Sequence, residues 1–501
     1  MRLDKIFKSK IKFFLFLLLG YFLSFSLPPY NYIALCFVIF PSLLYLLKIN
    51  ETENPKNFFL YGLLFSYGYF ISSLYWISYS LNFDPEVIIL KPLAIFILPL
   101  GLSIFYGAGF YILKRFCNFN YFFVLNFTII LSLIEYIRSN VTGFSWNLFV
   151  YALSKDIASL QILNIFGTFG LNLLIIFIFS YPYFLIKKKK IVIFKRLVIL
   201  FIIIGLNYLY GLNRLETKLI TKNQQIIFVQ PNQDLLKINL DQKEYIKNIL
   251  KISEPLNKSE KAIFLWPEGS YSFTTDKDLK NIFTSNFKSN QKIILGANTI
   301  DKFRNIYNSL VILNSKGEIL NHYNKIHLVP FGEFIPFENI IAFLNLKKVT
   351  FGYQSFSKGK DRSILNINEN LILPLICYEV IDTGNLNIGN ERFDVIFNIS
   401  EDGWFNRSIG TYQHFAHSIF RSIEEGKHIF RSTNQGVSAS ISPLGFTLKS
   451  SLPNKQTVLI DSYQILNKNT PFSVLGNLMF IFLTFICFLI QIFLKRYFKL
   501  S

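Results

Sequence analysis

Eight apolar runs, each long enough or nearly long enough to cross a bilayer, constrain the fold of this chain more than any other feature. They cover residues 11–27, 32–47, 58–81, 87–113, 121–137, 160–186, 197–212 and 472–494. A membrane-spanning helix needs about 20 mostly apolar residues. With 51% hydrophobic residues among 501, the chain is too apolar for an ordinary soluble enzyme. We therefore expect eight spans, of which seven precede a polar block and one follows it.

Basic residues predict the orientation of these spans. Lysine and arginine gather at the N-terminus and in alternate connections, with Lys114-Arg115 and the run Lys187–Lys190 as clear examples. Such loops lie on the cytoplasmic side. No small-residue cleavage site follows the first run, which leads into Pro28-Pro29, so we expect an uncleaved first helix. The polar block is then predicted outside the cytoplasm.

The net charge of +20 does not indicate nucleic-acid binding, because most of the excess lies outside residues 213–470, beside the apolar runs. Basic residues beside apolar runs indicate how the spans are oriented in the membrane, and they attract anionic lipids. No nucleic-acid partner is expected.

The polar block, residues 213–470, is predicted to fold as one α/β domain with mixed sheets. Its apolar runs predict strands at 225–229, 262–266, 292–297, 307–314, 318–323, 371–376 and 394–399. Helices are expected at 241–252 and 412–429, and further strands from residue 436 onward. The expected domains are thus 1–212 with seven helices, 213–470, and 471–501 with the last helix and a cytoplasmic tail.

Cys377 ends one of the predicted buried strands and is followed by Tyr378 and Glu379. It is the only cysteine of the polar block, since Cys36 and Cys487 fall in predicted spans and Cys117 in a cytoplasmic connection. A lone thiol in an oxidising compartment is either buried or used. An inert buried cysteine is the alternative to a nucleophile.

Two charged residues, Glu268 and Lys325, also follow apolar runs. Taken alone, Glu268 reads as a surface turn, and Lys325 is equally ordinary. Together with a thiol, a carboxylate base and a fixed cation make a nucleophilic site without a metal. Glu333 is a second carboxylate among apolar neighbours, and a structural ion pair is its alternative explanation.

No metal site and no cofactor are predicted. The histidines His414 and His417 share a helical face but lack a carboxylate or cysteine at matching spacing, which favours a surface or core role. No phosphate-binding glycine motif occurs, so nucleotide cofactors are not implied.

The ordered motifs around Glu268 (Trp-Pro-Glu), Lys325 (Tyr-Asn-Lys) and Cys377 (Ile-Cys-Tyr-Glu) resemble the Glu-Lys-Cys triad of the carbon-nitrogen hydrolase (nitrilase) superfamily. With seven spans before the block and one after, and the segments 325–336 and 398–405, the chain is similar to the apolipoprotein N-acyltransferase family. The resemblance implies a nitrilase-like αββα sandwich inserted in a polytopic helical membrane domain. It also implies location in a bacterial inner membrane, with the catalytic domain on the periplasmic side.

The resemblance further implies an activity and residue roles. Glu268 would be the general base, Cys377 the nucleophile and Lys325 the cation that stabilises tetrahedral intermediates. Glu333, Tyr378 and Glu379 match positions tied to activity, and we expect Glu333 and Glu379 to orient the lysine and the second substrate. A fatty acyl chain would pass from a phospholipid to the cysteine, and then to the α-amino group of a diacylglyceryl-cysteine at an apolipoprotein N-terminus.

Two positions depart from the family pattern: Ile238, where tryptophan is common, and Glu401, where asparagine is usual. Neither is expected to touch the three triad residues. Phe144, Trp146 and Tyr151 are expected either in an interfacial aromatic belt or lining a path for acyl chains.

Two other functions remain open on the sequence. A membrane-anchored amidase would use the same triad and hand the acyl group to water. A transporter or receptor with an outward ligand-binding domain would place charged residues within its spans, where Glu135 is the main example.

Overall fold

The computed structural model describes residues 2–120, 122–186, 188–236, 242–272, 282–335, 355–386 and 392–498. Ile238 therefore lies outside the described residues. The same holds for Lys187, for Pro336 at the end of the segment 325–336, and for Lys499 in the C-terminal tail. The chain divides into two compact units. The helical unit comprises 1–78, 91–217 and 471–501, and the sheet unit comprises 79–90 and 218–470.

The helical unit carries most of the apolar runs, except residues 79–81 and 87–90, which belong to the sheet unit. Its α-helices are α1 (Arg2–Leu23), α2 (Ala34–Ile49), α3 (Pro55–Leu74), α4 (Leu98–Phe116), α5 (Phe123–Thr142), α6 (Ile157–Leu160), α7 (Leu163–Ser180), α8 (Lys190–Leu215), α14 (Pro471–Leu475) and α15 (Leu478–Phe498). Within the described residues, six helical stretches are long and apolar enough to cross a membrane, at 55–83, 88–116, 123–142, 163–185, 190–215 and 478–497. The first two expected spans correspond to shorter apolar helices, Ile11–Ser26 and Ala34–Ile49. The helical unit is thus that of a membrane protein.

Glu135 is fully buried within the helical unit and has polar partners from two other helices. Tyr106 Oη donates to Glu135 Oε1 at 2.7 Å, and Asn172 Nδ2 donates to Glu135 Oε2. Asn172 Oδ1 in turn accepts from the backbone N–H of Val150, at 3.0 Å. Because both carboxylate oxygens are engaged between helices, this residue has a structural explanation.

The loop aromatics are packed rather than exposed. Trp146 and Tyr151 are buried, and the ring of Phe144 stacks on that of Trp146 with centroids 5.7 Å apart. Arg138 Nη2 donates to the Trp146 carbonyl at 3.0 Å. The loop after α5 is therefore anchored to that helix through its backbone carbonyls.

The sheet unit contains two mixed sheets. The first has the order β13-β1-β2-β4-β5-β6, with β3 beside β4, and the second has the order β12-β11-β10-β9-β8-β7. The strands of the first sheet are β1 (Ile220–Gln230), β2 (Ile263–Leu265), β3 (Tyr271–Ser272), β4 (Lys292–Ile300), β5 (Ile306–Asn314), β6 (Ile319–Asn324) and β13 (Thr457–Ile465). Those of the second are β7 (Leu365–Ile367), β8 (Asn370–Ile376), β9 (Val395–Ser400), β10 (His428–Thr433), β11 (Ala439–Ile441) and β12 (Thr447–Ser450).

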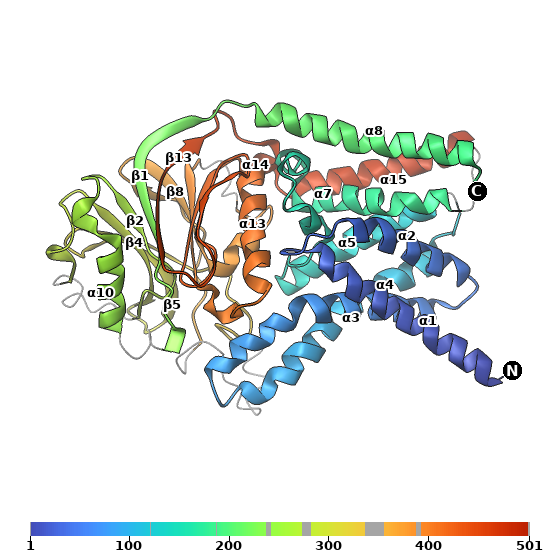
Figure 1. The fold of residues 1–501 in the computed structure, drawn as a ribbon, viewed down its shortest axis with the longest axis horizontal. Coiled ribbons are helices and arrows are strands. Elements are labelled where there is room, and N and C mark those ends of the chain that lie inside the picture. Colours follow the sequence, from blue (N-terminus) through green and yellow to red (C-terminus); the bar gives the residue numbers. More distant parts are fainter. Residues whose placement is uncertain are drawn as a thin grey trace. The chain divides into compact units, whose positions relative to one another are not determined.

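The two sheets pack face to face, and a helix lies on the outer face of each: α10 (Gln242–Ser253) on the first and α13 (Gly410–Glu425) on the second (Figure 1). A buried cluster between the sheets includes Phe228, Ile312, Ile376 and Phe397. Strands β2, β8 and β9 are largely apolar on both faces because both faces are covered.

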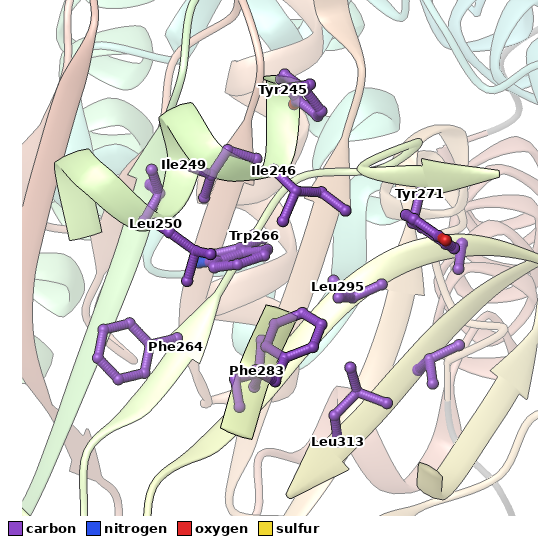
Figure 2. Close-up of a cluster of buried hydrophobic side chains, with 14 of the residues drawn as sticks. Tyr245, Ile246, Ile249, Leu250, Phe264, Trp266, Tyr271, Phe283, Leu295 and Leu313 are labelled. Carbon is purple, nitrogen blue, oxygen red and sulfur yellow. The ribbon is translucent and has the colours of Figure 1, made fainter. Parts of the chain in front are cut away.

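A second cluster joins α10 to the first sheet. Figure 2 shows Ile246, Ile249 and Leu250 of α10 grouped around Trp266, which is fully buried. Trp266 also packs against Phe283, with ring centroids 5.9 Å apart. This packing fixes Trp266, which directly follows β2 and lies two residues before Glu268.

The predicted helix at 412–429 is wrong at its C-terminal end. Helix α13 ends at Glu425, and Gly426 follows with φ +63°, a left-handed conformation that glycine adopts easily. Strand β10 then begins at His428, so the sequence interpretation missed this strand. Its Arg431 is fully buried, and a charged residue inside a strand obscures the apolar pattern.

Candidate active site

Four strand ends from the two sheets converge on one site. Glu268 comes three residues after β2, Lys325 directly after β6, Cys377 directly after β8 and Glu401 directly after β9. Parallel strands such as β8 and β9 present their carboxyl ends at one edge of a sheet. The three residues proposed from the sequence are thus brought together from separate sheets.

The ammonium of Lys325 lies between two carboxylates. Its Nζ is 3.3 Å from Glu268 Oε1 and 3.0 Å from Glu333 Oε1. The lysine is 1% exposed, and burial disfavours its charge, but Glu268 and Glu333 outweigh that effect and raise the pKa of Lys325. A permanent positive charge is therefore held at a fixed point of the site.

Asn308 of β5 fixes both carboxylates from the other side. Its Nδ2 donates to Glu268 Oε1 and to Glu333 Oε1, each at 2.7 Å. Its backbone carbonyl accepts from the Lys325 N–H at 2.8 Å. Asn308 thus contacts all three charged residues, and the sequence analysis did not single it out.

Glu333 lies in a tight turn that follows Lys325. Its Oε2 accepts from the Val329 N–H at 2.8 Å, and its own N–H donates to the Val329 carbonyl at 2.8 Å. Phe331, between them, has φ +61° and is 54% exposed. The turn therefore buries the carboxylate and leaves an aromatic side chain outside.

Cys377 has φ +49°, a left-handed conformation uncommon for a residue with a side chain. It begins a short 3-10 helix, Cys377–Ile381, directly after β8. The Asn398 amide and the His414 ring hold its backbone carbonyl, with Nδ2 at 3.5 Å and Nε2 at 3.3 Å. This sharp strand-to-helix turn is typical of a presented nucleophile.

The surroundings of Cys377 favour the protonated thiol. Burial raises its pKa well above the usual range, the Glu268 carboxylate raises it further, and the Lys325 ammonium acts in the opposite direction. A base is then needed to remove the proton as the sulfur attacks. Glu268 is a neighbouring carboxylate, and its Oε2 accepts from the Glu401 N–H at 2.9 Å.

Glu379 connects the lysine segment to the cysteine segment. Its Oε1 accepts from the N–H groups of Ile326 and His327, at 3.0 and 3.3 Å, and from Tyr323 Oη at 2.7 Å. Its Oε2 accepts from the Ile376 N–H at 2.8 Å. Fully buried, this carboxylate holds backbone in place on both sides of the site.

Tyr378 is 8% exposed and meets His327 edge to face, with ring centroids 4.9 Å apart. His327 Nδ1 lies 2.7 Å from Asp382 Oδ1, and Asp382 Oδ2 also contacts Arg362 Nη2 at 3.3 Å. These aromatic and charged groups pack around the residue that follows the cysteine.

A buried network supports the cysteine from behind. Arg431 Nη2 donates to Asp402 Oδ2 at 2.8 Å and lies 2.9 Å from His414 Nδ1. Burial and the guanidinium lower the pKa of His414, while Asp402 acts in the opposite direction. The ring joins two parts of the site, since its Nδ1 also lies 3.0 Å from Asp402 Oδ1 and its Nε2 lies 3.3 Å from the Cys377 carbonyl. Burial opposes the charge of Asp402, but Arg431 and His414 outweigh it and keep its pKa below the usual range.

Comparisons with known proteins cover most of the chain. The pattern of the apolipoprotein N-acyltransferase N-terminal domain matches residues 19–180, and that of carbon-nitrogen hydrolase matches residues 228–464. The apolipoprotein N-acyltransferase of Rickettsia prowazekii is 32% identical over 505 residues, which cover 97% of this chain and 98% of that protein. This chain belongs to the apolipoprotein N-acyltransferase family. The apolipoprotein N-acyltransferase of Rhodopseudomonas palustris is 31% identical, and the match covers 86% of this chain and 85% of that protein.

The sheet unit accordingly has the carbon-nitrogen hydrolase fold, and the protein is an enzyme of that superfamily. Among solved structures, a superfamily member from Xanthomonas campestris is 16% identical, with a TM-score of 0.35, and the match covers 49% of this chain and 91% of that one.

One departure from the usual apolipoprotein N-acyltransferase pattern lies inside the site, contrary to the expectation that it would not touch the triad. The backbone N–H of Glu401 donates to Glu268, while its Oε1 accepts from the Gly403 N–H at 2.8 Å. Burial raises the pKa of Glu401 well above the usual range, and the Glu268 and Asp402 carboxylates raise it further. The neutral acid is thereby favoured, and it has the same zero charge as the asparagine usual at this position.

Sequence reasoning missed Asn308, Asp402, His414 and Arg431 as parts of the site. Asn308 lies within a predicted strand, where an amide among apolar neighbours was the available signal. His414 was assigned a surface or core role, and it is indeed fully buried. Its bond to the Cys377 carbonyl depends on how α13 packs against the second sheet, which no local pattern reports.

Proposed function

We propose that this protein transfers a fatty acyl chain from a phospholipid to the α-amino group of the diacylglyceryl-cysteine at an apolipoprotein N-terminus. The relatives carry the name of this activity, and they match 86% and 97% of the chain. The observation that carries the proposal is the contact of Lys325 with Glu268 beside a cysteine in a strained turn. A base, a fixed cation and a presented thiol are what acyl transfer through a thioester requires.

In the first half-reaction, Glu268 accepts the proton of Cys377 as the sulfur attacks the ester carbonyl of the donor lipid. Lys325 stabilises the negative charge that forms on the carbonyl oxygen. When the intermediate collapses, the C–O bond breaks and Glu268 returns the proton to the leaving alkoxide. A lysophospholipid departs, and the acyl chain remains on the sulfur as a thioester.

In the second half-reaction, the neutral α-amine of the acceptor attacks the thioester carbonyl. Glu268 removes a proton from the nitrogen, and Lys325 again stabilises the oxyanion. The C–S bond then breaks, and the thiolate regains its proton from Glu268. The two substrates thus react in turn at one site, a ping-pong sequence without metal or cofactor in any step.

The supporting residues have distinct roles in this proposal. Glu333 is the second carboxylate that holds the Lys325 ammonium, at 3.0 Å. Glu379 fixes the backbone of the lysine and cysteine segments together, and we infer that it acts as a positioning residue. Tyr378, which borders the cysteine, is proposed to contact the acyl chain or the acceptor.

We further propose that all eight apolar segments span a bacterial inner membrane, with residues 213–470 as a periplasmic αββα domain between the seventh and eighth spans. The charge asymmetry between alternate connections supports this orientation. In intact spheroplasts, added protease should release fragments from 213–470, whereas a reporter fused after Lys499 should stay protected. Protection of the 213–470 block would reverse the orientation.

The covalent intermediate provides the direct test of function. Full-length enzyme given phospholipid labelled in an acyl chain should acquire label that neutral hydroxylamine removes, as thioesters require. Cys377→Ala should acquire none. Adding a diacylglyceryl peptide with a free α-amino group should move the label to the peptide as an amide.

A membrane-anchored amidase is the second candidate, because it uses the same residues. It would release labelled free fatty acid at one rate with or without the peptide. That outcome would assign the hydrolase, and absence of any label on Cys377 would refute both enzymes.

A further inference from the structure

The turn between β4 and β5, residues 300–305, presents apolar side chains to the outside at the edge of the site. Phe303 is 73% exposed and Ile300 is 51% exposed. An exposed aromatic side chain at the tip of a hairpin gains nothing from folding, since its apolar area stays in water. Such a side chain is typical of a contact with a partner or a membrane.

The turn holds Phe303 in a defined position. Asp301 Oδ1 accepts from the N–H groups of Phe303 and Asn305, both at 2.9 Å. Asp301 Oδ2 accepts from Asn305 Nδ2 at 2.9 Å and from Tyr307 Oη at 3.2 Å. The Asn305 amide, with the backbone donors, keeps the pKa of Asp301 below its usual range. Arg304, with φ +64°, completes a tight turn in which the Asp301 carboxylate bonds Phe303, Asn305 and Tyr307.

Two cationic residues flank Phe303 in the sequence. Lys302 Nζ lies 5.1 Å from the centroid of the Phe303 ring, and Arg304 follows directly in the chain. An aromatic side chain flanked by Lys and Arg matches the interfacial zone of an anionic leaflet, where the ring enters the acyl boundary and the cations meet phosphates.

The turn lies at the same sheet edge as the catalytic carboxylate. The Gly296 N–H of β4 donates to the Pro267 carbonyl, directly before Glu268. Two residues further, Asn298 pairs with Asn308, whose amide bonds Glu268. Ile300 is two residues beyond Asn298, or roughly 7 Å along the strand. The exposed tip thus extends past the site on the side where strands end.

A second exposed aromatic side chain belongs to the neighbouring turn. Phe331 is carried by the turn that places Glu333, and Asn308 bonds that carboxylate as well. Asn308 and Glu333 are joined by this hydrogen bond. Phe303 lies five residues before Asn308, and Phe331 lies two residues before Glu333. Two separate turns beside the same carboxylates expose large apolar side chains.

We propose that the 300–305 turn is a lipid-contact site, which inserts Phe303 into the interface of an anionic phospholipid leaflet while Lys302 and Arg304 bind headgroup phosphates. Flanking cations favour a lipid surface over an apolar protein groove, because a groove would have to pair or desolvate both charges. Docking in this way brings the mouth of the site to the layer that holds acyl-chain donors.

Fluorescence quenching tests the contact itself. The full chain with Phe303→Trp, reconstituted in vesicles of phosphatidylglycerol and brominated phosphatidylcholine, should lose the emission that the new indole adds over wild type. The matched control is Leu320→Trp. The Leu320 side chain is 51% exposed and lies near the start of β6, which pairs with the end of β5 farther from the 300–305 turn. Equal quenching at both positions, or none at 303, would overturn the proposal. Binding of another protein in place of lipid would give no quenching at 303.

Acylation rates test the consequence, and this second experiment rests on the proposed function. Phe303→Ser should slow acyl-enzyme formation from vesicle-borne donor by about tenfold. The same variant should match wild type with a short-chain donor dissolved as monomers. Lys302→Gln with Arg304→Gln should remove the rate increase given by anionic lipid, about fivefold per charge, whereas Lys316→Gln at the far turn should not. A wild-type enzyme that forms no acyl-enzyme would refute the proposed function while leaving the quenching result to decide on the lipid contact.

Discussion

The side-chain amide of Asn308 donates a 2.7 Å hydrogen bond to Glu268 Oε1, the oxygen that also faces the Lys325 ammonium. The same Nδ2 donates to Glu333, so one neutral side chain bridges the two carboxylates that hold the lysine. The amide separates two negative charges that would otherwise repel each other. It is also the kind of contact that leaves no mark in the sequence beyond one polar residue in a strand.

Replacement of Asn308 should impair chemistry more than folding. Asn308→Ala removes one donor from each carboxylate, and we expect acyl-enzyme formation to fall by about tenfold to a hundredfold, as for loss of a buried hydrogen bond to charged groups. Asn308→Asp should be worse, since a third carboxylate replaces the donor. Single-turnover labelling with acyl-labelled phospholipid measures both. Equal rates for Asn308→Asp and wild type would contradict the bridging role.

Asp402 should be needed for stability because it neutralises Arg431 inside the protein. Asp402→Asn leaves a fully buried guanidinium beside a neutral amide, and we expect a loss of about 3–5 kcal/mol in the free energy of unfolding. The matched control is Asp394→Asn, where the carboxylate is only partly buried and accepts from the Leu371 N–H, with an expected loss of about 1 kcal/mol. Denaturant unfolding in detergent, followed by tryptophan fluorescence, gives both values. Similar losses in the two variants would argue against a buried ion pair.

The placement of Glu268, Lys325 and Cys377 at strand ends could be predicted because each follows a run that the structure confirms as a strand. Strands β2, β6 and β8 end within three residues of Glu268, Lys325 and Cys377. Apolar runs that stop at a polar residue report a strand end directly. The family resemblance then indicated which of many strand ends belong together.

The rest of the site could not be predicted, because it depends on contacts between segments far apart in sequence. Arg431 reaches Asp402 and His414 across the second sheet, and each lies on a different element. Buried charges also hid strand β10, whose sequence His-Ile-Phe-Arg-Ser-Thr shows no clean alternation. Pairing of such groups is decided by packing, and a local pattern reports only that they are polar.

Stability should fall as the pH is lowered, partly because of His428. Burial lowers its pKa to about 3, and its Nδ1 accepts from the Gln464 N–H at 3.1 Å, which leaves no room for a second proton. The unfolded chain binds that proton near pH 6.5. The stabilisation is therefore complete above pH 6.5 and is lost as the pH falls toward 3, with a slope of up to about 1.4 kcal/mol per pH unit. His428→Gln should flatten the dependence by that amount in unfolding measurements at pH 4–8, while an unchanged slope would contradict the assignment.

Glu401 should limit activity at high pH. As the neutral acid it adds no charge beside Glu268, whereas its ionised form adds a carboxylate next to the base and to Asp402. Glu401→Gln keeps the neutral shape, so we expect acyl-enzyme formation to be preserved near neutral pH and its alkaline decline to move upward. Glu401→Asp, which can still ionise, should retain a decline. Profiles of initial acylation rate against pH compare the three proteins, and a Gln variant that loses activity at every pH would remove this role.

The proton affinity of Cys377 should respond in opposite directions to its two charged neighbours. Glu268 raises the pKa of the thiol and Lys325 lowers it, although burial is the largest influence. Replacing the carboxylate by an amide, Glu268→Gln, removes a nearby negative charge and should shift the midpoint of alkylation by iodoacetamide to lower pH. Lys325→Met removes the cation and should shift that midpoint to higher pH. The midpoint of the pH profile is the readout, because it separates thiolate formation from the loss of acyl transfer that both variants should show. Cys377→Ala gives the background from the other three cysteines. A shift of the same sign in both variants would mean that structural disturbance, rather than the charge of Glu268 and Lys325, controls the thiol.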